Sequence, residues 1–282
     1  MPDIKEKLSI NAEIVENALK SCYTYSSFNA PQLIEAQKYG LLDGGKRIRA
    51  FLVLEICRLF CSDYTPAIPY ACAIEMIHAS SLIHDDMPCM DNDDMRRGKP
   101  STHKKYGEAL ALLSGDAMMV KAFEVAINNN MLSVEQNAKS VEIIASSTGE
   151  NGMLAGQTMD IGAAKQKLDL ETLVKLHNYK TGKLITASAK LGCVAAGIFE
   201  NDERYSAVVK YAENVGLAFQ IVDDILDYND GKRELNSFLS FMSVEDARQY
   251  AFDLTKSGIS AIAPYDNGTF TELAKYLIIR EY

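Results

Sequence analysis

Residues 74–104 read IEMIHASSLIHDDMPCMDNDDMRRGKPSTHK, and this stretch sets a dense carboxylate cluster directly before a pair of arginines. Four positions in its first half recur at the spacing of one helix face: Ile74, Ile77, Ser81 and Asp85. Pro88 disfavours the α conformation at the residue before it, so the helix is expected to end near Asp86. The stretch therefore predicts a helix that carries acidic residues at its C-terminus.

The carboxylates of this stretch indicate a bound cation. Asp85, Asp86 and Asp91 would surround a helix C-terminus, where the helix dipole is already negative and further acid is destabilising. Oxygen ligands suit a hard ion such as Mg²⁺, which usually completes its shell with water and substrate phosphate. Arg96 and Arg97 follow, with the fork geometry that binds phosphate oxygens. An Asp-rich turn can also be a solvated loop, so a second observation is needed.

A second acidic cluster weakens the solvated-loop alternative. Asp223, Asp224 and Asp227 lie in FQIVDDILDY, an apolar sequence in which solvated charges are not expected. Gln220, Asp223 and Asp227 share one helix face by their spacing. Carboxylates at this spacing repel each other, and apolar surroundings raise the cost of ionising them without counter-charge. The two clusters together predict a shared metal and diphosphate site.

Composition sets the limits for the rest of the interpretation. The chain has 282 residues, of which 48% are hydrophobic, and no linker divides it, so we expect a single domain over residues 1–282. A net charge of -9 argues against a nucleic-acid partner and does not favour an anionic membrane surface. No run approaches the ~20 apolar residues of a spanning helix, and the amphipathic first 20 residues lack a signal core. We expect a soluble, cytoplasmic protein without stable membrane insertion.

Helical periodicity occurs almost throughout the chain, and alternating strand patterns are hard to find, which predicts an all-α protein. Gly40 is expected to close the second helix, and Thr181 with Gly182 to interrupt a long helix that begins after Asp169. Ser133 with Gln136 forms a capping box, and two other pairs, Ser243 with Asp246 and Thr269 with Glu272, resemble caps. The main helices are expected at residues 3–20, 31–39, 104–129, 133–148 and 202–228, with Gly107 and Gly115 interrupting the segment 104–129.

Basic residues gather where a glycine turn enters an apolar helix. Lys46, Arg47 and Arg49 follow Gly44 and Gly45, at the end of the helix that is unfavourable for positive charge. Two interpretations remain open for this cluster. It contributes solubility, or it forms an anion site in which backbone amides and cationic side chains converge.

Five elements occur in a fixed order between Gly44 and Asp227: GGKRIR, HDDMPCMDNDDMRRGK, GQTMD, KTG and FQIVDDILD. Together they resemble the trans-prenyl diphosphate synthases, near the bacterial farnesyl diphosphate synthases. A lone DDxxD would be weak evidence, whereas this ordered set is very specific. The resemblance implies the isoprenoid synthase fold, in which antiparallel helices surround a deep cavity, and a homodimer.

The resemblance also implies roles for single residues. The metal ligands for Mg²⁺ would be Asp85, Asp86, Asp91, Asp223, Asp224 and Asp227. Arg96 would bind the allylic diphosphate, and the isopentenyl diphosphate site would comprise Lys46, Arg49, His78 and Arg97. Lys180, Thr181 and Gln220 would lie near the allylic diphosphate and the developing cation. The residues expected to act directly in catalysis are Asp85, Asp86, Asp91, Arg96, Lys180 and Asp223. His84 and His103 are given structural roles.

The implied reaction condenses isopentenyl diphosphate with an allylic diphosphate, dimethylallyl or geranyl, by ionisation, condensation and elimination. Product length would depend on the cavity wall at the level of Ser80 and Ser81. Many similar farnesyl synthases carry an aromatic side chain at the Ser80 position, so geranylgeranyl diphosphate is the alternative product. Met118 and Met119 could close the pocket instead. We predict farnesyl diphosphate.

Two other functions and one departure from the family stay open. A terpene cyclase is disfavoured because its second metal motif usually combines Asp, Asn, Ser or Thr with Glu, whereas this chain has DDILD there. A non-catalytic subunit of a prenyl synthase is disfavoured because the acidic and basic positions are intact. The departure is in residues 227–248, DYNDGKRELNSFLSFMSVEDAR, where relatives generally have a longer loop with a lysine that closes over diphosphate. Either this loop is shortened or a mobile segment is missing from the printed residues, and we expect the second.

Overall fold

The computed structural model describes residues 3–23, 30–42, 44–163, 166–231 and 235–279. Within them the chain is almost entirely helical, which confirms the all-α prediction. The helices are α1 Ile4–Ser21, α2 Pro31–Leu41, α3 Ile48–Phe60, α4 Ile68–Asp85, α5 Thr102–Tyr106, α6 Glu108–Ile127, α7 Val134–Thr148, α8 Met153–Ala163, α9 Leu170–His177, α10 Lys183–Ala195, α11 Glu203–Asn229, α12 Val244–Ile262 and α13 Thr269–Ile279. Short 3₁₀ turns η1 Thr65–Ala67 and η3 Phe238–Ser240, the π-helical turn η2 Asn178–Gly182, and the two-stranded hairpin β1 Met95–Arg96 and β2 Lys99–Pro100 complete it.

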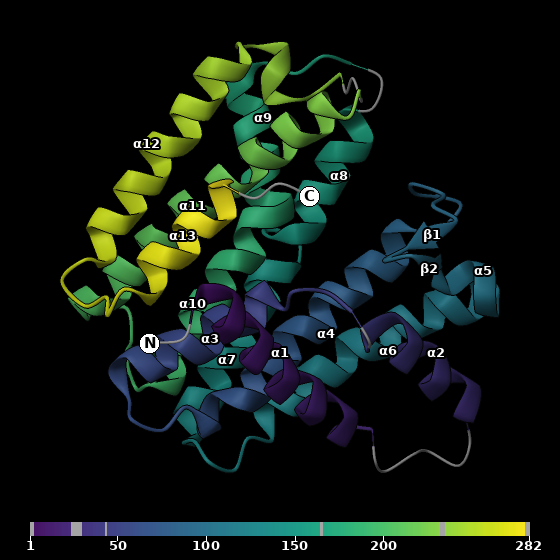
Figure 1. Cartoon of the computed structure of the whole chain (residues 1–282). Helices are drawn as coiled ribbons and strands as arrows, with labels where there is room; N and C mark the ends of the chain where they lie inside the picture. Colours follow the sequence, from purple (N-terminus) through teal and green to yellow (C-terminus); the bar gives the residue numbers. More distant parts are fainter. Residues whose placement is uncertain (1–2, 24–29, 43, 164–165, 232–234, 280–282) are drawn as a thin grey trace.

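Helix α10 lies at the centre of the arrangement (Figure 1). It packs against α3, α7 and α11, so it joins the N-terminal helices to the group formed by α11, α12 and α13. Most residues of α10 are buried, so this helix contributes more than one face to the core. In the described part of the chain, no helix is both long and apolar enough to cross a membrane.

Helix boundaries follow the local signals with two exceptions. The capping box of Ser133 with Gln136 is present, and Asp169 accepts a hydrogen bond from Thr172 N at 2.7 Å. Gly40, however, does not end α2, which continues to Leu41. A Cβ on Gly40 would lie 2.6 Å from Ile83 Cδ1, so this glycine permits α2 to approach α4 closely. The prediction that Gly40 is a helix terminator was wrong.

The second exception is Gly115, which was expected to interrupt the segment 104–129 but lies inside α6, whereas the interruption expected at Gly107 is confirmed. Gly107 has φ of 84° and separates α5 from α6, because this left-handed conformation favours glycine and breaks the helix.

Near the C-terminus, Ser243 caps α12 as predicted, accepting from Asp246 N at 3.1 Å. The Asp266 carboxylate accepts from Phe270 N and so supplies the cap of α13 that the sequence pattern had suggested for Thr269.

Arg47 forms a buried charged network that links four helices. Its guanidinium donates to Glu75 Oε2 at 3.1 Å, to Glu16 Oε2 at 2.8 Å and to Leu41 O at 2.5 Å. Glu75 also accepts from Ala50 N at 3.1 Å, so it caps α3. Burial by itself would lower the pKa of Arg47, but the two carboxylates raise it. Arg47 therefore does not belong to the basic cluster expected at the start of α3, because its positive φ of 51° turns it into the core.

The connection after the second acidic motif joins α11 to η3, and residues 232–234 within it lie outside the described part. The expectation that a loop segment is missing from the given residues stays a prediction. Asn236 fastens this connection to the link between α8 and α9. It accepts from Leu168 N at 2.9 Å and donates to Ala163 O at 2.8 Å and Gln166 O at 3.0 Å.

Replacing Asn236 by alanine is expected to lower the free energy of unfolding by about 1–3 kcal/mol, because Leu168 N and two carbonyls lose their partner. Urea unfolding followed by circular dichroism measures this change. Gln249→Ala is the matched control, since Gln249 bonds only to Asp253 on the exposed side of α12. Identical unfolding midpoints for Asn236→Ala and the wild type would show that the clamp contributes nothing.

Candidate active site

A cavity of about 160 Å³ lies between α3, α4, α6, α8 and η2. Six of its lining residues were predicted from the sequence to act in binding, catalysis or control of product length: Arg49, His78, Ser81, Asp85, Lys180 and Thr181. The other lining residues are Leu82, His84, Met90, Met119, Met153, Leu154 and Gln157. The cavity thus combines polar groups from four separate segments with a wall rich in methionine.

The first acidic motif surrounds the end of α4. Asp85 is the last residue of this helix, and Asp91 N donates to Asp85 O at 2.9 Å, so the chain turns back on itself. The pKa of the Asp85 carboxyl is raised to about 6, mainly by burial and also by the charges of Asp91 and Asp86, while Lys180 and Arg96 oppose this. A cation at this position would relieve the electrostatic strain.

Asp86 has a different environment from Asp85. Its side chain is buried, and its Oδ1 accepts from Arg96 Nε at 2.9 Å and from Arg96 Nη2 at 2.5 Å. Arg96 stands on β1 of the hairpin and also contacts Asp93 at 3.2 Å. Burial raises the pKa of the Asp86 carboxyl, and the hydrogen bond from Arg96 opposes this. The hairpin therefore holds Arg96 against the first motif.

Three basic side chains converge beside α3. Arg97 has φ of 53° and extends over the glycine turn, donating to Gly44 O at 3.1 Å, and a Cβ on Gly44 would lie 3.0 Å from Arg97 Cδ. Arg49 Nε is inaccessible to solvent and has no hydrogen-bond partner among the described residues. Burial lowers the pKa values of Arg49 and Arg97. The charge of Arg97 lowers the pKa of Arg49 further, and the charge of Arg47 lowers that of Arg97. An anion bound here would satisfy both groups.

His78 completes this basic group from the side of α4. Burial and then the charge of Arg49 and Arg97 hold the pKa of His78 well below its ordinary value, so the imidazole is neutral at pH 7. Lys46 was predicted to join this site, but it is exposed and lies 5.6 Å from the Tyr276 ring centroid on α13. Arg49 and His78 line the cavity, and Arg97 lies near enough for its charge to act on both of them, whereas neither Arg97 nor Lys46 is among the lining residues.

The predicted helix break at Thr181 and Gly182 is a π-helical turn, η2, which continues directly into α10. A Cβ on Gly156 would lie 2.2 Å from Lys180 N, so this glycine allows α8 to approach the turn. Lys180 Nζ donates to Asp160 Oδ2 at 2.5 Å, and Thr181 Oγ1 donates to Gln220 Oε1 at 3.3 Å. Single π turns inside α-helices are frequent at functional sites.

The second acidic motif is divided between two environments. Asp224 is buried and accepts from Phe238 N at 2.8 Å, so it holds the connection that follows α11. Asp223 and Asp227 are only half-buried, on the part of α11 that carries Gln220. Within the described ranges, no three Asp, Glu, His or Cys side chains lie close enough to enclose a metal ion. This open arrangement fits Mg²⁺, which usually takes one or two carboxylates and completes its shell with water and phosphate.

The two serines predicted to control product length occupy different positions. Ser81 lines the cavity, whereas Ser80 is fully buried and donates to Ile77 O at 2.8 Å. Met119 forms part of the wall, and Met118 is buried behind it. Ser80 is therefore not a wall residue.

Two polar residues near the turn had no site role in the sequence analysis. Gln157 lines the cavity and Asp160 pairs with Lys180, although their spacing alone suggested a structural pair. Their position in the motif GQTMD was the available signal. His84 also lines the cavity, with Nε2 3.2 Å from Leu112 O and 3.5 Å from Asp116 Oδ1, whereas His103 is buried beside Ser101.

Known proteins with similar sequences and structures show the family of this chain. The model of the polyprenyl synthetase family matches residues 30–238. The farnesyl diphosphate synthase of Haemophilus influenzae is 38% identical, over 90% of this chain and 90% of that protein. The heterodimeric geranylgeranyl pyrophosphate synthase large subunit 1 of Arabidopsis thaliana, a chloroplastic protein, is 36% identical over 99% of this chain and 80% of that protein.

Solved structures give the same result for the fold. An FPP/GFPP synthase from Zymomonas mobilis superposes with a TM-score of 0.90 at 34% identity, covering 98% of both chains. A geranyltransferase from Legionella pneumophila superposes with a TM-score of 0.90 at 33% identity, covering 98% of this chain and 96% of that one. The resemblance inferred from the five ordered motifs is thereby confirmed, and the chain belongs to the polyprenyl synthetase family as a trans-prenyl synthase with the all-α isoprenoid synthase fold.

Proposed function

We propose that this protein condenses isopentenyl diphosphate with dimethylallyl or geranyl diphosphate to form farnesyl diphosphate, with Mg²⁺ as cofactor. The observation that carries the proposal is the lining of one cavity, which would supply two poles for diphosphates. Asp85, through a bound metal ion, and Lys180 would form one pole, and Arg49 with His78 would form the other. A reaction between two diphosphates requires two such poles beside one apolar space.

The metal would be held by the two acidic motifs. The candidates are the six residues predicted from the sequence: Asp85, Asp86, Asp91, Asp223, Asp224 and Asp227. When bound, the ion supplies Lewis-acid stabilisation of the negative charge that develops on the departing diphosphate. Asp85 is the leading candidate because burial and neighbouring carboxylates already disfavour its ionised form without a cation.

The protein's own groups would divide the remaining work. Lys180 and Arg96 would hold the leaving diphosphate with charge-assisted hydrogen bonds. Thr181 donates its hydroxyl proton to Gln220, so the lone pairs of its oxygen stay available to a nearby allylic cation. At the other pole, Arg49, His78 and Arg97 would bind isopentenyl diphosphate and place its double bond beside that cation. The released pyrophosphate would take the proton that is eliminated.

Water must be excluded while the allylic cation exists. Met90, Met119 and Met153 line the cavity with flexible, polarizable side chains that adapt to a prenyl chain. Since the relatives include proteins named as farnesyl and as geranylgeranyl synthases, product length has to be argued from this wall. A volume of about 160 Å³ with Met119 in place favours the shorter product.

The proposal is tested with purified protein, Mg²⁺, labelled isopentenyl diphosphate and geranyl diphosphate, followed by chromatography of the dephosphorylated alcohols. Farnesol as the main product supports it. Geranylgeraniol would favour the alternative of a geranylgeranyl diphosphate synthase. Absence of any prenyl product would favour a non-catalytic subunit of a prenyl synthase.

The Met119→Ala variant is expected to shift the main product from farnesol to geranylgeraniol in the same assay. Removing this side chain opens the cavity wall, so a second condensation can follow before release. Met131→Ala is the matched control, because Met131 is exposed and lies outside the cavity. An unchanged product ratio in Met119→Ala would show that another residue limits chain length.

We also propose a homodimer that forms through α6. Leu113, Val120 and Ile127 recur at seven-residue intervals on this helix and are 55%, 69% and 45% exposed. Exposed apolar side chains that recur along one helix are typical of an interaction surface. Sedimentation of the wild type should give twice the monomer mass of 31.1 kDa, and Val120→Glu should give the monomer. Phe252→Glu, at an exposed position on α12, serves as the control, and a dimeric Val120→Glu would exclude this surface.

A further inference from the structure

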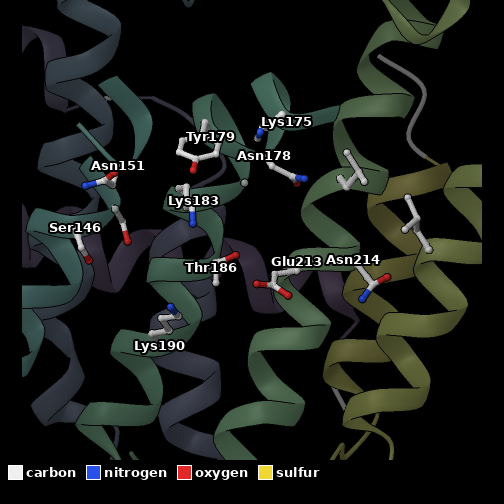
Figure 2. A pocket seen from close by; sticks show the side chains of 14 residues that line it. Ser146, Asn151, Lys175, Asn178, Tyr179, Lys183, Thr186, Lys190, Glu213 and Asn214 are labelled. Atoms are coloured by element: carbon white, nitrogen blue, oxygen red, sulfur yellow. The ribbon is translucent and has the colours of Figure 1, made fainter. Parts of the chain in front are cut away.

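A second cavity of about 690 Å³ lies outside the site described above (Figure 2). Side chains from α7, α9, η2, α10, α11 and α12 line it. Figure 2 shows Thr186 and Lys190 on α10 and Glu213 and Asn214 on the neighbouring α11, with Thr186 and Glu213 on the facing sides of the two helices. Its volume lies within the range of about 300–1,000 Å³ that is usual for small-molecule sites.

Most residues that line this cavity carry polar groups. Leucine occurs only at Leu217 and Leu254 of the lining, and the other side chains carry hydroxyl, amide, amine or carboxylate groups, apart from a glycine. Ser147 and Thr186 are each 7% exposed, so buried parts of the wall also present hydroxyls. A hydroxylated ligand would find hydrogen-bond partners on such a surface.

The charge of the cavity is opposite to that of the whole protein. Lys175, Lys183 and Lys190 line it with one carboxylate, Glu213, which leaves an excess of two positive charges in a chain of net charge -9. None of the three lysines forms a hydrogen bond or ion pair with a described residue. Lys183 lies 5.2 Å from the Tyr179 ring centroid. Burial and the charge of Lys183 lower the pKa of Lys190. An anionic group would stabilise this arrangement.

The π-helical turn η2 separates the two cavities. Asn178, Tyr179 and Gly182 line the polar cavity, whereas Lys180 and Thr181 line the catalytic one. Five consecutive residues of η2 therefore serve both cavities, which provides a direct structural link between them. Single π turns inside α-helices are frequent at functional sites.

We propose that the polar cavity binds a phosphorylated small molecule with a hydroxylated body, such as a nucleoside phosphate or a sugar phosphate, and that this ligand modulates prenyl transfer through η2. The lysines provide the phosphate contacts, and the amides and hydroxyls contact the body of the ligand. The modulation rests on the proposed function. The binding itself does not depend on it.

Binding is measured by isothermal titration calorimetry of ADP and of fructose 1,6-bisphosphate into the full chain, without Mg²⁺ and without prenyl substrates. We expect saturable binding of at least one probe, and the stronger of the two identifies the class of ligand. The double variant Lys183→Ala/Lys190→Ala should bind the same probe with an affinity at least about tenfold lower, because two charge-assisted contacts are lost. Lys256→Ala, an exposed lysine of α12, should bind like the wild type. No saturable binding of either probe, or equal binding by the double variant, overturns the proposal.

A further variant separates the two cavities. Arg96→Ala removes a phosphate contact proposed for the catalytic cavity and should leave calorimetric binding unchanged. Loss of binding in Arg96→Ala with normal binding in the double lysine variant would place the ligand in the catalytic cavity and overturn the proposal. In steady-state assays, a saturating probe should change the KM for geranyl diphosphate of the wild type and not of the double variant. An unchanged wild-type KM would overturn the modulation and leave the binding site in place.

Discussion

Asp85→Asn is expected to reduce kcat/KM for prenyl transfer by about 10³-fold, since one electrostatic contact aimed at developing charge contributes on this scale. Asparagine keeps the shape of the side chain and removes its charge. Asp85 lies at the end of α4, on the cavity wall, where the charges of Asp91 and Lys180 act on its pKa. A steady-state assay should show this loss of kcat/KM, and the circular dichroism spectrum of Asp85→Asn should match that of the wild type.

The matched control is Asp94→Asn. Asp94 belongs to the same turn but is exposed and pairs with Lys104 at 2.7 Å. It should retain wild-type turnover. Chelation of divalent cations with EDTA should abolish the activity of the wild type, and added Mg²⁺ should restore it. Near-normal turnover in Asp85→Asn would remove this residue from the proposed metal site.

Arg47→Met is expected to lower the free energy of unfolding by about 3–5 kcal/mol, because breaking a buried ion pair leaves the partner charge uncompensated. The partner here is Glu75, which is 2% exposed and receives two hydrogen bonds, one from Arg47 and one from Ala50 N. Leu41 O also loses a donor. Denaturant unfolding measures the difference.

Arg204→Met provides the comparison for this variant. Arg204 pairs with Asp202 at 2.6 Å on the surface, where solvent screens the interaction, so its loss should change stability little. Adding Glu75→Gln to Arg47→Met should recover part of the loss, since it removes the unpaired charge and keeps an acceptor for Ala50 N. If Arg47→Met unfolds at the wild-type denaturant concentration, the network is not a source of stability.

Much of the fold could be predicted from local signals. The end of α4 follows from Pro88, and the start of α7 follows from the capping box at Ser133, because these signals act within a few residues. The break at Thr181 and Gly182 was also visible in the sequence and is now seen as η2. These features depend on backbone hydrogen bonds between near neighbours.

The fate of individual side chains was less predictable. Arg47 and Arg49 are two residues apart in one basic motif, yet Arg47 pairs with Glu75 in the core and Arg49 faces the cavity. Ser80 and Ser81 are adjacent, and only Ser81 reaches the cavity wall. Each pair looks equivalent in the sequence, because composition does not report the direction of a side chain.

The sequence by itself determined the helical class, the family and the two acidic motifs with their basic partners, since ordered motifs and helical periodicity are properties of the chain. Only the tertiary structure decided which groups meet. Lys180 and Asp160 are brought together because Gly156 lets α8 touch η2, and Arg97 reaches Gly44 across more than fifty residues of chain. Such contacts arise from the packing of helices that are distant in sequence, and packing depends on the shapes of all the side chains at once.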